Sequence, residues 1–160
     1  MSTALPTRTV TINAAFLQEI KDVHQELWQL LEESRRFVRH PVSMSRQCAE
    51  FVDMLQELRD KVALHFALED AYGYFEDPLD VPPRFAQRAL DLREEHGTLY
   101  VEISELADEG AQLLHERKLA SLTTTLVHRF EEFCARFEAH EAAEIDMIQS
   151  TFGEDIGEGD

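Results

Sequence analysis

Two stretches decide the fold: His65-Phe-Ala-Leu-Glu69 and, near the other end of the chain, His140-Glu-Ala-Ala-Glu144. Each places a histidine and a glutamate four residues apart in a run that is typical of helix, so both side chains leave the same helix face. On an exposed face such a pair is an ordinary surface contact, whereas on a buried face the same groups are candidate metal ligands. The apolar pattern around each pair decides between these interpretations.

Apolar residues around both pairs recur at alternating steps of four and three. The two series are Phe51, Leu55, Leu58, Val62, His65, Glu69, Tyr72 and Leu126, Phe130, Phe133, Phe137, His140, Glu144, Met147. This rhythm predicts that both pairs occupy core positions of amphipathic helices. A buried carboxylate is costly unless it is paired or bound to metal. A buried His–Glu hydrogen bond would explain either pair alone, but two pairs on matching faces favour a metal site.

Two further helices each carry one inward histidine. The first helix is predicted over residues 11–39, before Pro41, with the buried line Phe16, Ile20, His24, Leu27, Leu31. Taken alone, His24 could also be a core histidine bonded to a carbonyl. The third helix is predicted from residues 82–83 to Leu113, with the buried line Phe85, Ala89, Leu92, His96, Leu99, Ile103, Leu106.

The other two helices carry the His–Glu pairs. The second is predicted from Ser43 or Ser45 to Asp77, before Pro78, and the fourth from residues 119–121 to Thr151. Four long amphipathic helices with short connections predict an all-α fold, an antiparallel up-down-up-down four-helix bundle. We expect residues 1–10 to form a flexible N-terminal arm, residues 11–152 the bundle, and residues 153–160 an acidic disordered tail.

One feature does not fit this bundle. His24 lies 17 residues before Pro41 and His65 lies 24 residues after it, so His65 would sit deeper by about 10 Å of helical rise. Either the second helix starts late, or the first connection is longer and asymmetric.

Composition limits the possible functions. A chain of 160 residues with a formal charge of −17 is a single domain that argues against nucleic acid or an anionic membrane as partner. Cys48 and Cys134 form no CxxC motif and indicate no disulfide framework. The first residues do not resemble a signal peptide and no apolar run is long enough to span a membrane, so we expect a cytoplasmic protein.

The inward polar residues form a candidate ligand set. Four of the seven histidines fall on the four buried lines, whereas His40, His115 and His128 do not and are predicted to be surface residues. With Glu69 and Glu144, the four imidazoles suit two divalent ions, and the mixed nitrogen and oxygen set favours iron over structural zinc or manganese. A ferritin-like site needs a glutamate three residues before a histidine. Those positions hold Lys21, Val62, Arg93 and Phe137, which excludes that family.

The ordered set of motifs resembles a known family. It comprises a lone His24 in the first helix, His65-Phe-x-x-Glu69-Asp70, Glu95-His96, and His140-x-x-x-Glu144. Over about residues 12–150 this set is similar to the hemerythrin family, specifically the hemerythrin-like HHE cation-binding domain. The resemblance implies two non-haem iron ions, oxo- or hydroxo-bridged, that meet O2, peroxide or nitric oxide. It also implies that His24 and His65 bind one iron, His96 and His140 the other, and Glu69 and Glu144 bridge them.

Two departures from that family matter. Oxygen-carrying hemerythrins have a histidine four residues after the third, where this chain has Tyr100, and they end with a His–Asp pair at one longer spacing. The set of four histidines and two glutamates is more like the domains of iron-centre repair proteins and of the iron-sensing F-box protein. Tyr100 is four residues after His96 and can face the site as an iron ligand, a hydrogen-bond donor or a redox-active group. Alternatively, it is a core residue that only packs.

Three functions therefore stay open. The protein is a sensor or binding protein for O2 or nitric oxide, an enzyme that decomposes peroxide or runs a related redox reaction, or a protein for iron storage, donation or iron-centre repair. In each case metal removal should lower stability. Charge repulsion between protonated histidines predicts that the metal-free protein is also more sensitive to acid.

Overall fold

The chain is described by a computed structural model that covers residues 14–72 and 83–157, with side chains described for residues 22–40, 42–44, 46–71 and 83–150. Over these residues the only regular structure is helical, which confirms the all-α class. The elements are α1 (Ala14–Arg39), α2 (Pro41–Arg46), α3 (Cys48–Tyr72), α4 (Pro83–His115), α5 (Leu119–Ser121), a π-helical turn (Leu122–Leu126) and α6 (Val127–Gly157). The predicted arm, residues 1–10, and the predicted end of the second helix at Asp77 lie outside the described residues.

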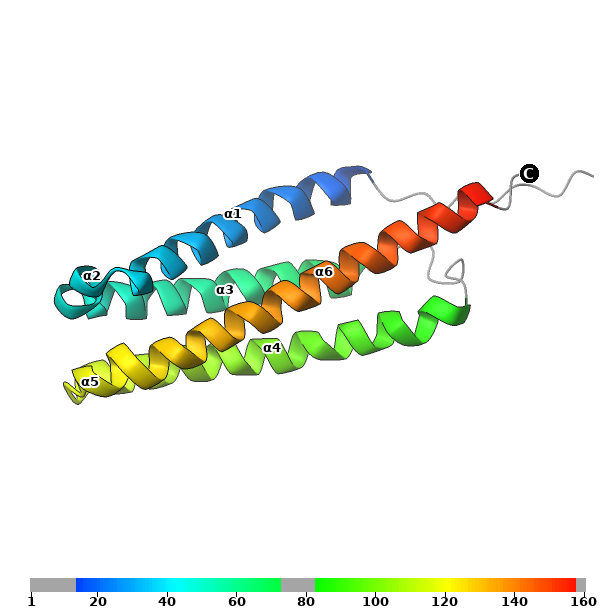
Figure 1. Cartoon of the computed structure of the whole chain (residues 1–160). Helices are drawn as coiled ribbons and strands as arrows, with labels where there is room; N and C mark the ends of the chain where they lie inside the picture. The colour runs from blue at the N-terminus through cyan, green and yellow to red at the C-terminus, as the bar shows by residue number, and fades with distance from the viewer. Residues whose placement is uncertain (1–13, 73–82, 158–160) are drawn as a thin grey trace, which may run out of the picture.

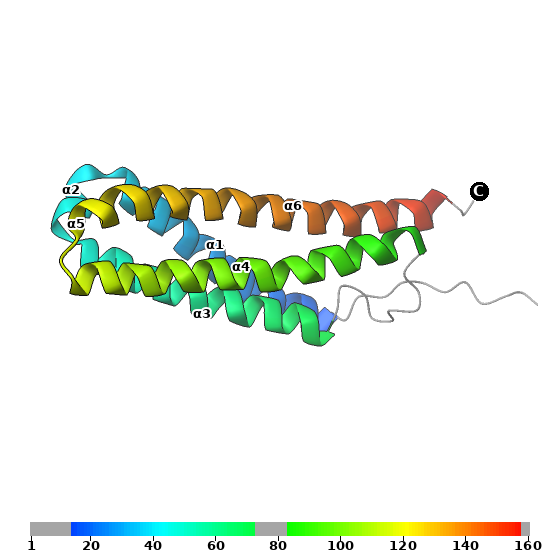
Figure 2. The same ribbon diagram turned by 90° about the horizontal axis from the view of Figure 1, so that it is seen from below.

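The long helices α1, α3, α4 and α6 lie side by side (Figures 1 and 2). Helix α1 packs on α3, α3 on α4, and α4 on α6, and α6 also contacts α1. In Figure 1 the chain runs along α1 to α2, returns along α3, runs back along α4 to α5 and returns along α6. The short helices α2 and α5 therefore lie at the same end of the molecule, where the chain reverses.

The connection between α1 and α3 differs from the predicted one. Instead of one helix beginning at Ser43 or Ser45, the separate helix α2 ends at Gln47, whose backbone (φ −132°, ψ 37°) leaves the helical region. The long helix α3 then begins at Cys48. His24 lies 15 residues before the end of α1 at Arg39, and His65 lies 17 residues after the start of α3. The late start of α3 therefore brings the two histidines to nearly the same depth.

The last helical stretch begins where the sequence predicts and contains an unpredicted π-helical turn. The turn spans the run Leu-Thr-Thr-Thr-Leu, in which the Thr123 hydroxyl donates to the Leu119 carbonyl (2.9 Å) and the Thr124 hydroxyl to the Ala120 carbonyl (2.6 Å). Such bonds from threonine side chains to preceding carbonyls compete with the regular backbone ladder and accompany its local widening.

Helix α6 also ends later than predicted. It continues through Gly157, so residues 153–157 are helical rather than part of a disordered tail. No proline interrupts this segment, and Gly153 weakens a helix without ending it.

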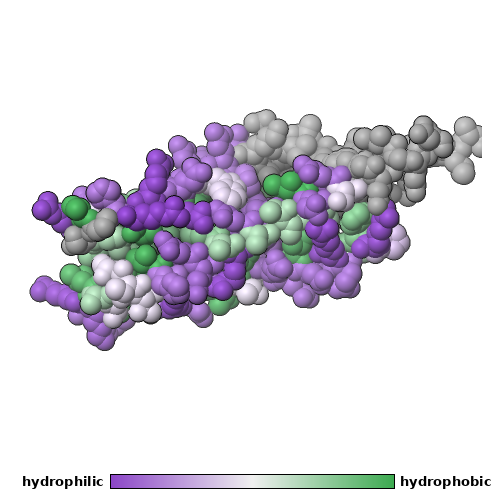
Figure 3. Space-filling view, in the orientation of Figure 1, coloured by the Kyte–Doolittle hydropathy of each residue, from purple (hydrophilic) through white to green (hydrophobic). Residues whose placement is uncertain are grey.

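The apolar core falls into two clusters. The large one is built from α1, α2, α3, α4, the π-helical turn and α6, and includes Leu27, Phe51, Ile103, Phe130 and Phe137. The small one contains Phe85, Leu92 and Met147. The face in Figure 3 is mainly hydrophilic, as the charge of −17 requires. Within the described residues, none of the helices combines the length and apolar character needed to cross a membrane.

Candidate metal centre

Seven polar side chains converge between the two apolar clusters, supplied by all four long helices. Helix α1 supplies His24, α3 supplies His65 and Glu69, α4 supplies His96, and α6 supplies His140, Glu141 and Glu144. Six of them are at most 6% exposed, and His24 is half-buried. Such a concentration of ionisable groups in a core requires that they compensate one another or bind an ion.

One group consists of Glu69, His96, His140 and Glu144, whose ligand atoms lie within 4.8 Å of one another. His96 Nε2 is 3.0 Å from Glu144 Oε1 and 3.1 Å from Glu69 Oε2. His140 Nε2 is 2.8 Å from the same Glu144 oxygen. Two imidazole nitrogens and two carboxylates therefore face one point.

A second group consists of His24, His65 and Glu141, again within 4.8 Å. His65 Nε2 is 2.9 Å from Glu141 Oε1, and His24 Nδ1 is 3.5 Å from Glu141 Oε2. The two imidazole rings lie 5.3 Å apart between centroids. This group defines a second point beside the first.

Glu69 connects the two groups. Its Oε1 lies 2.8 Å from His65 Nε2 and its Oε2 lies 3.1 Å from His96 Nε2, so its two oxygens face different groups. Glu144 also belongs to both, because its carboxylate lies within 4.8 Å of ligand atoms of His65, Glu69 and Glu141. Two carboxylates shared between two sets of imidazoles are the arrangement expected of a two-ion site.

Two of these buried atoms are close to opposite groups without a hydrogen bond. Glu69 Oε2 and His140 Nε2 have no hydrogen-bond partner, although they lie 3.1 and 2.8 Å from an imidazole nitrogen and a carboxylate oxygen. Their contacts are short but not aligned as donor and acceptor. Atoms that point at a shared position rather than at each other fit metal ligation.

The structure brings together the six ligands expected from the sequence: His24, His65, Glu69, His96, His140 and Glu144. Sequence reasoning missed Glu141. A signal was present, because Glu141 lies four residues after the buried Phe137 and three before Glu144, on the flank of the same helix face. The apolar line was drawn one residue wide at this point, and the real buried face is wider.

The side chain of Tyr100 is not among the buried groups of the site. Tyr100 is 40% exposed on α4, whereas Leu99 and Ile103 take the inward positions beyond His96. A spacing of four residues permits but does not require a shared face, and here the spacing of three is the buried one. The expectation that Tyr100 faces the site is therefore not met.

From this placement we expect Tyr100→Phe to leave the metal content and the visible spectrum of the metal-loaded protein unchanged. The phenol hydroxyl is removed from a partly solvated position, so the stability change should stay within about 0.5 kcal/mol. Metal analysis and absorption spectra of the purified variant test this. Loss of a visible band in Tyr100→Phe would return the tyrosine to the site.

A third pair with the same spacing shows that spacing alone does not make a ligand pair. His128 Nε2 lies 3.2 Å from Glu132 Oε1, but both side chains are exposed. His40 and His115 do not join the ligand groups either. The His128–Glu132 pair is therefore a matched control for the buried pairs.

Aromatic rings enclose the histidines. Phe66 stacks on His96 with centroids 4.1 Å apart and planes 6° apart, and it meets His140 edge-on at 5.6 Å. Trp28 lies 5.8 Å from the His24 ring and 5.8 Å from Phe137. These contacts fix the orientation of the imidazoles and keep water away from all but the His24 side.

The carboxylates change the pKa of the histidines. Burial alone would lower the pKa of His65, but hydrogen bonds and charge from Glu141 and Glu69 raise it to about 10. His96 behaves likewise, with its pKa raised to about 10 by Glu144 and Glu69 against the effect of burial. The pKa of His140 is raised by Glu144 and Glu95, whereas burial and the charge of His65 lower the pKa of His24. Burial and the neighbouring carboxylates raise the pKa of Glu141.

These pKa values set the pH dependence of the metal-free protein. A histidine whose folded pKa lies above its unfolded value of 6.5 contributes stability that is complete below pH 6.5 and is lost as the pH rises through the folded value, here about 10. We therefore expect the metal-free protein to lose roughly several kcal/mol between pH 6.5 and 10, since a tenfold difference in proton affinity corresponds to about 1.4 kcal/mol. Denaturant unfolding after chelation measures it, and stability that rises over this range would contradict it.

Comparison with protein-family models, with curated proteins and with solved structures finds no match to this chain. The assignment of the site therefore rests on its residues and their geometry.

Proposed function

We propose that this chain is a hemerythrin-like, non-haem di-iron protein built as an antiparallel up-down-up-down four-helix bundle, which binds and reacts with O2, peroxide or nitric oxide. The observation that carries the proposal is Glu69, whose two oxygens face His65 and His96 from two different ligand groups. The buried and shared carboxylates, four histidines on four helices, and the order of the motifs along the chain support it.

The donor set supports iron. Four imidazoles and three carboxylates face the centre, and no thiolate from the described residues does: Cys134 packs in the large apolar cluster, where burial raises the pKa of its thiol to about 12. Structural zinc sites commonly include thiolates in a closed tetrahedron. His24, His65 and Glu141 would hold one ion, His96 and His140 the other, with Glu69 and Glu144 between them. Bound there, a pair of iron ions supplies one-electron redox chemistry toward small oxygen and nitrogen species.

The residues of the chain perform the remaining work. Phe66, Phe137 and Trp28 exclude water from the ligand groups, which strengthens every charge interaction inside. The three carboxylates neutralise the positive charge of the ions, and in the metal-free protein they neutralise the protonated histidines instead. Metal binding is therefore coupled to the release of protons from His65, His96 and His140.

The proposal is tested on protein purified without a chelating tag and loaded anaerobically with ferrous iron. We expect about two iron ions per chain and a near-ultraviolet charge-transfer band after oxidation. His65→Ala should lose iron, whereas His128→Ala, with the same spacing to a glutamate but on the surface, should match the parent. One zinc ion per chain, with no uptake of iron, would overturn the assignment.

Iron storage, donation or iron-centre repair is the alternative, and an enzymatic role is the third candidate. A steady-state assay of peroxide loss with iron-loaded protein separates an enzyme from a sensor or binding protein. Rapid transfer of iron from the loaded protein to an acceptor chelator, without peroxide turnover, would favour iron handling.

A further inference from the structure

Two carboxylates outside the ligand groups contact the far ring nitrogens of two histidines. His96 Nδ1 lies 3.0 Å from Asp70 Oδ1, and His140 Nδ1 lies 2.7 Å from Glu95 Oε2. The pattern repeats from helix to helix: Asp70 follows the ligand Glu69 on α3 and reaches the histidine of α4, while Glu95 precedes that histidine on α4 and reaches the histidine of α6.

Such a contact decides which nitrogen faces the ion. A neutral imidazole carries one proton, and a carboxylate beside Nδ1 keeps that proton on Nδ1, which then donates to the carboxylate. The lone pair is left on Nε2, and Nε2 is the atom of both His96 and His140 that faces Glu144. Each carboxylate therefore holds its imidazole in the tautomer and orientation that ligation needs.

The other ligand group lacks this support at His65. The Nδ1 atom of His65 is buried and has no hydrogen-bond partner. His24 turns its Nδ1 toward Glu141, a member of its own group, and is half-buried. Within the described side chains, carboxylate support at the far ring nitrogen is thus found on the His96 and His140 side only.

We infer that Asp70 and Glu95 are positioning residues that set the metal affinity of the His96 and His140 position and leave the His24 and His65 position unaffected. This inference rests on the proposed two-ion function. It assigns a role to two residues that do not themselves face the ion.

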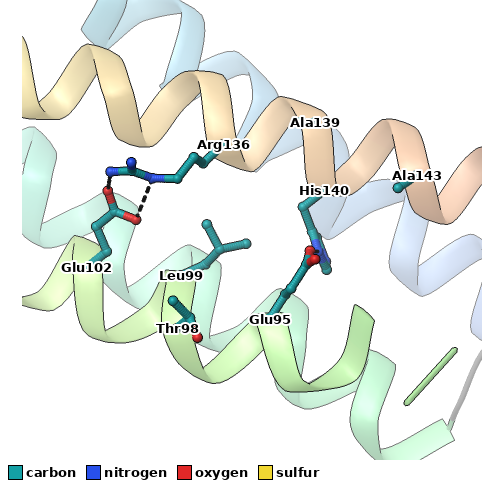
Figure 4. A pocket seen from close by; sticks show the side chains of 8 residues that line it. All are labelled: Glu95, Thr98, Leu99, Glu102, Arg136, Ala139, His140 and Ala143. Atoms are coloured by element: carbon teal, nitrogen blue, oxygen red, sulfur yellow. Dashed lines mark hydrogen bonds and ion pairs between the residues drawn. The ribbon is translucent and has the colours of Figure 1, made fainter. Parts of the chain in front are cut away.

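Glu95 lies in the wall of a groove between α4 and α6, with a volume of about 370 Å³ (Figure 4). In Figure 4 the Glu95 side chain rises from α4 to meet the His140 ring, and farther along the groove Arg136 is paired with Glu102. The Glu95 side chain is 52% exposed and that of Asp70 is 38% exposed. Substitution at either position therefore removes no buried packing, and its effect on metal binding can be separated from an effect on folding.

The experiment uses Glu95→Ala, Glu95→Gln, Asp70→Ala and Asp70→Asn, with Glu94→Ala as the control, since Glu94 is the exposed neighbour of Glu95 on α4. Cobalt(II) or zinc(II) is the probe, titrated against a competing chelator. We expect each alanine variant to weaken one of the two binding steps by about 10- to 100-fold and to leave the other step unchanged. The amide variants keep an acceptor oxygen and should lose less.

A second readout is independent of affinity. In the zinc-loaded parent the Nδ1 protons of His96 and His140 should resonate far downfield and exchange slowly, and each alanine variant should lose the resonance of its own histidine. If both binding steps weaken equally, or if the variants match Glu94→Ala in affinity and resonances, the inference is overturned and the two-ion function stands. A parent chain that binds no cobalt, zinc or iron overturns the proposed function instead, and the Nδ1 protons can then be read in the metal-free protein.

Discussion

Removal of both metal ions is expected to lower the free energy of unfolding by several kcal/mol and to lower the thermal midpoint. The ligand groups come from four helices that are brought together only by folding, so the ions bind the native state and not the unfolded chain. An ion present at a thousand times its dissociation constant stabilises the native state by about 4 kcal/mol per site. The metal-free protein keeps part of its stability, because its histidines and carboxylates pair with one another.

The measurement is denaturant unfolding of the iron- or zinc-loaded protein at pH 7, with and without a chelator. His65→Ala should show a smaller response to the chelator, because its loaded form binds less metal, and His128→Ala should respond like the parent. Equal unfolding midpoints for loaded and chelated parent protein would contradict the prediction.

Glu69→Ala is expected to weaken both metal positions together, by more than about 100-fold each, since even residues behind a ligand change affinity by about 10- to 100-fold. The reason is that Glu69 places one oxygen beside His65 and the other beside His96. Glu141→Ala, by contrast, removes a carboxylate of the His24 and His65 group and should weaken mainly that position.

Calorimetric titration with zinc or cobalt measures both steps. Glu132→Ala is the matched control, because Glu132 pairs with His128 at the same spacing on the exposed face of α6. Glu69→Gln keeps one oxygen acceptor and removes the charge, so its affinity should fall between those of the parent and Glu69→Ala. A variant that loses one ion only would show that Glu69 does not bridge the two positions.

The helices and the six expected ligands could be predicted because the period of the apolar residues fixes which face of each helix is buried. Around His65 and His140 this period holds over many residues, and the structure buries both histidines. The class of fold and the convergence of histidines from four helices follow from that one pattern.

Other features depend on contacts between helices, which a period along one helix does not contain. Glu141 lies beside the apolar line rather than on it, and only the position of α1 makes its flank a buried one. Tyr100 and Leu99 compete for the same inward place after His96, and packing decides for Leu99. The break at Gln47 follows from a local backbone angle that no strong turn residue announces.

The sign of the pH dependence is the clearest case. Histidines considered alone predict repulsion in acid, but the structure sets Glu69, Glu141 and Glu144 against them, and these carboxylates raise the pKa of His65 and His96 to about 10. The metal-free protein should therefore be weakened by alkali, whereas the histidine pattern along the sequence predicts that protons weaken it.

The polar centre also divides the apolar core, and this has a consequence for local unfolding. On one side lies the large cluster, and on the other the buried side chains of Phe85, Leu92 and Met147 hold the start of α4 to the later part of α6. So small a cluster gives a small barrier to opening, and the ion ligands His96 and Glu144 are the next contacts inward. Bound metal thus acts as a clasp for that end, and amide hydrogens there should exchange much faster in the metal-free protein while those in the large cluster stay protected.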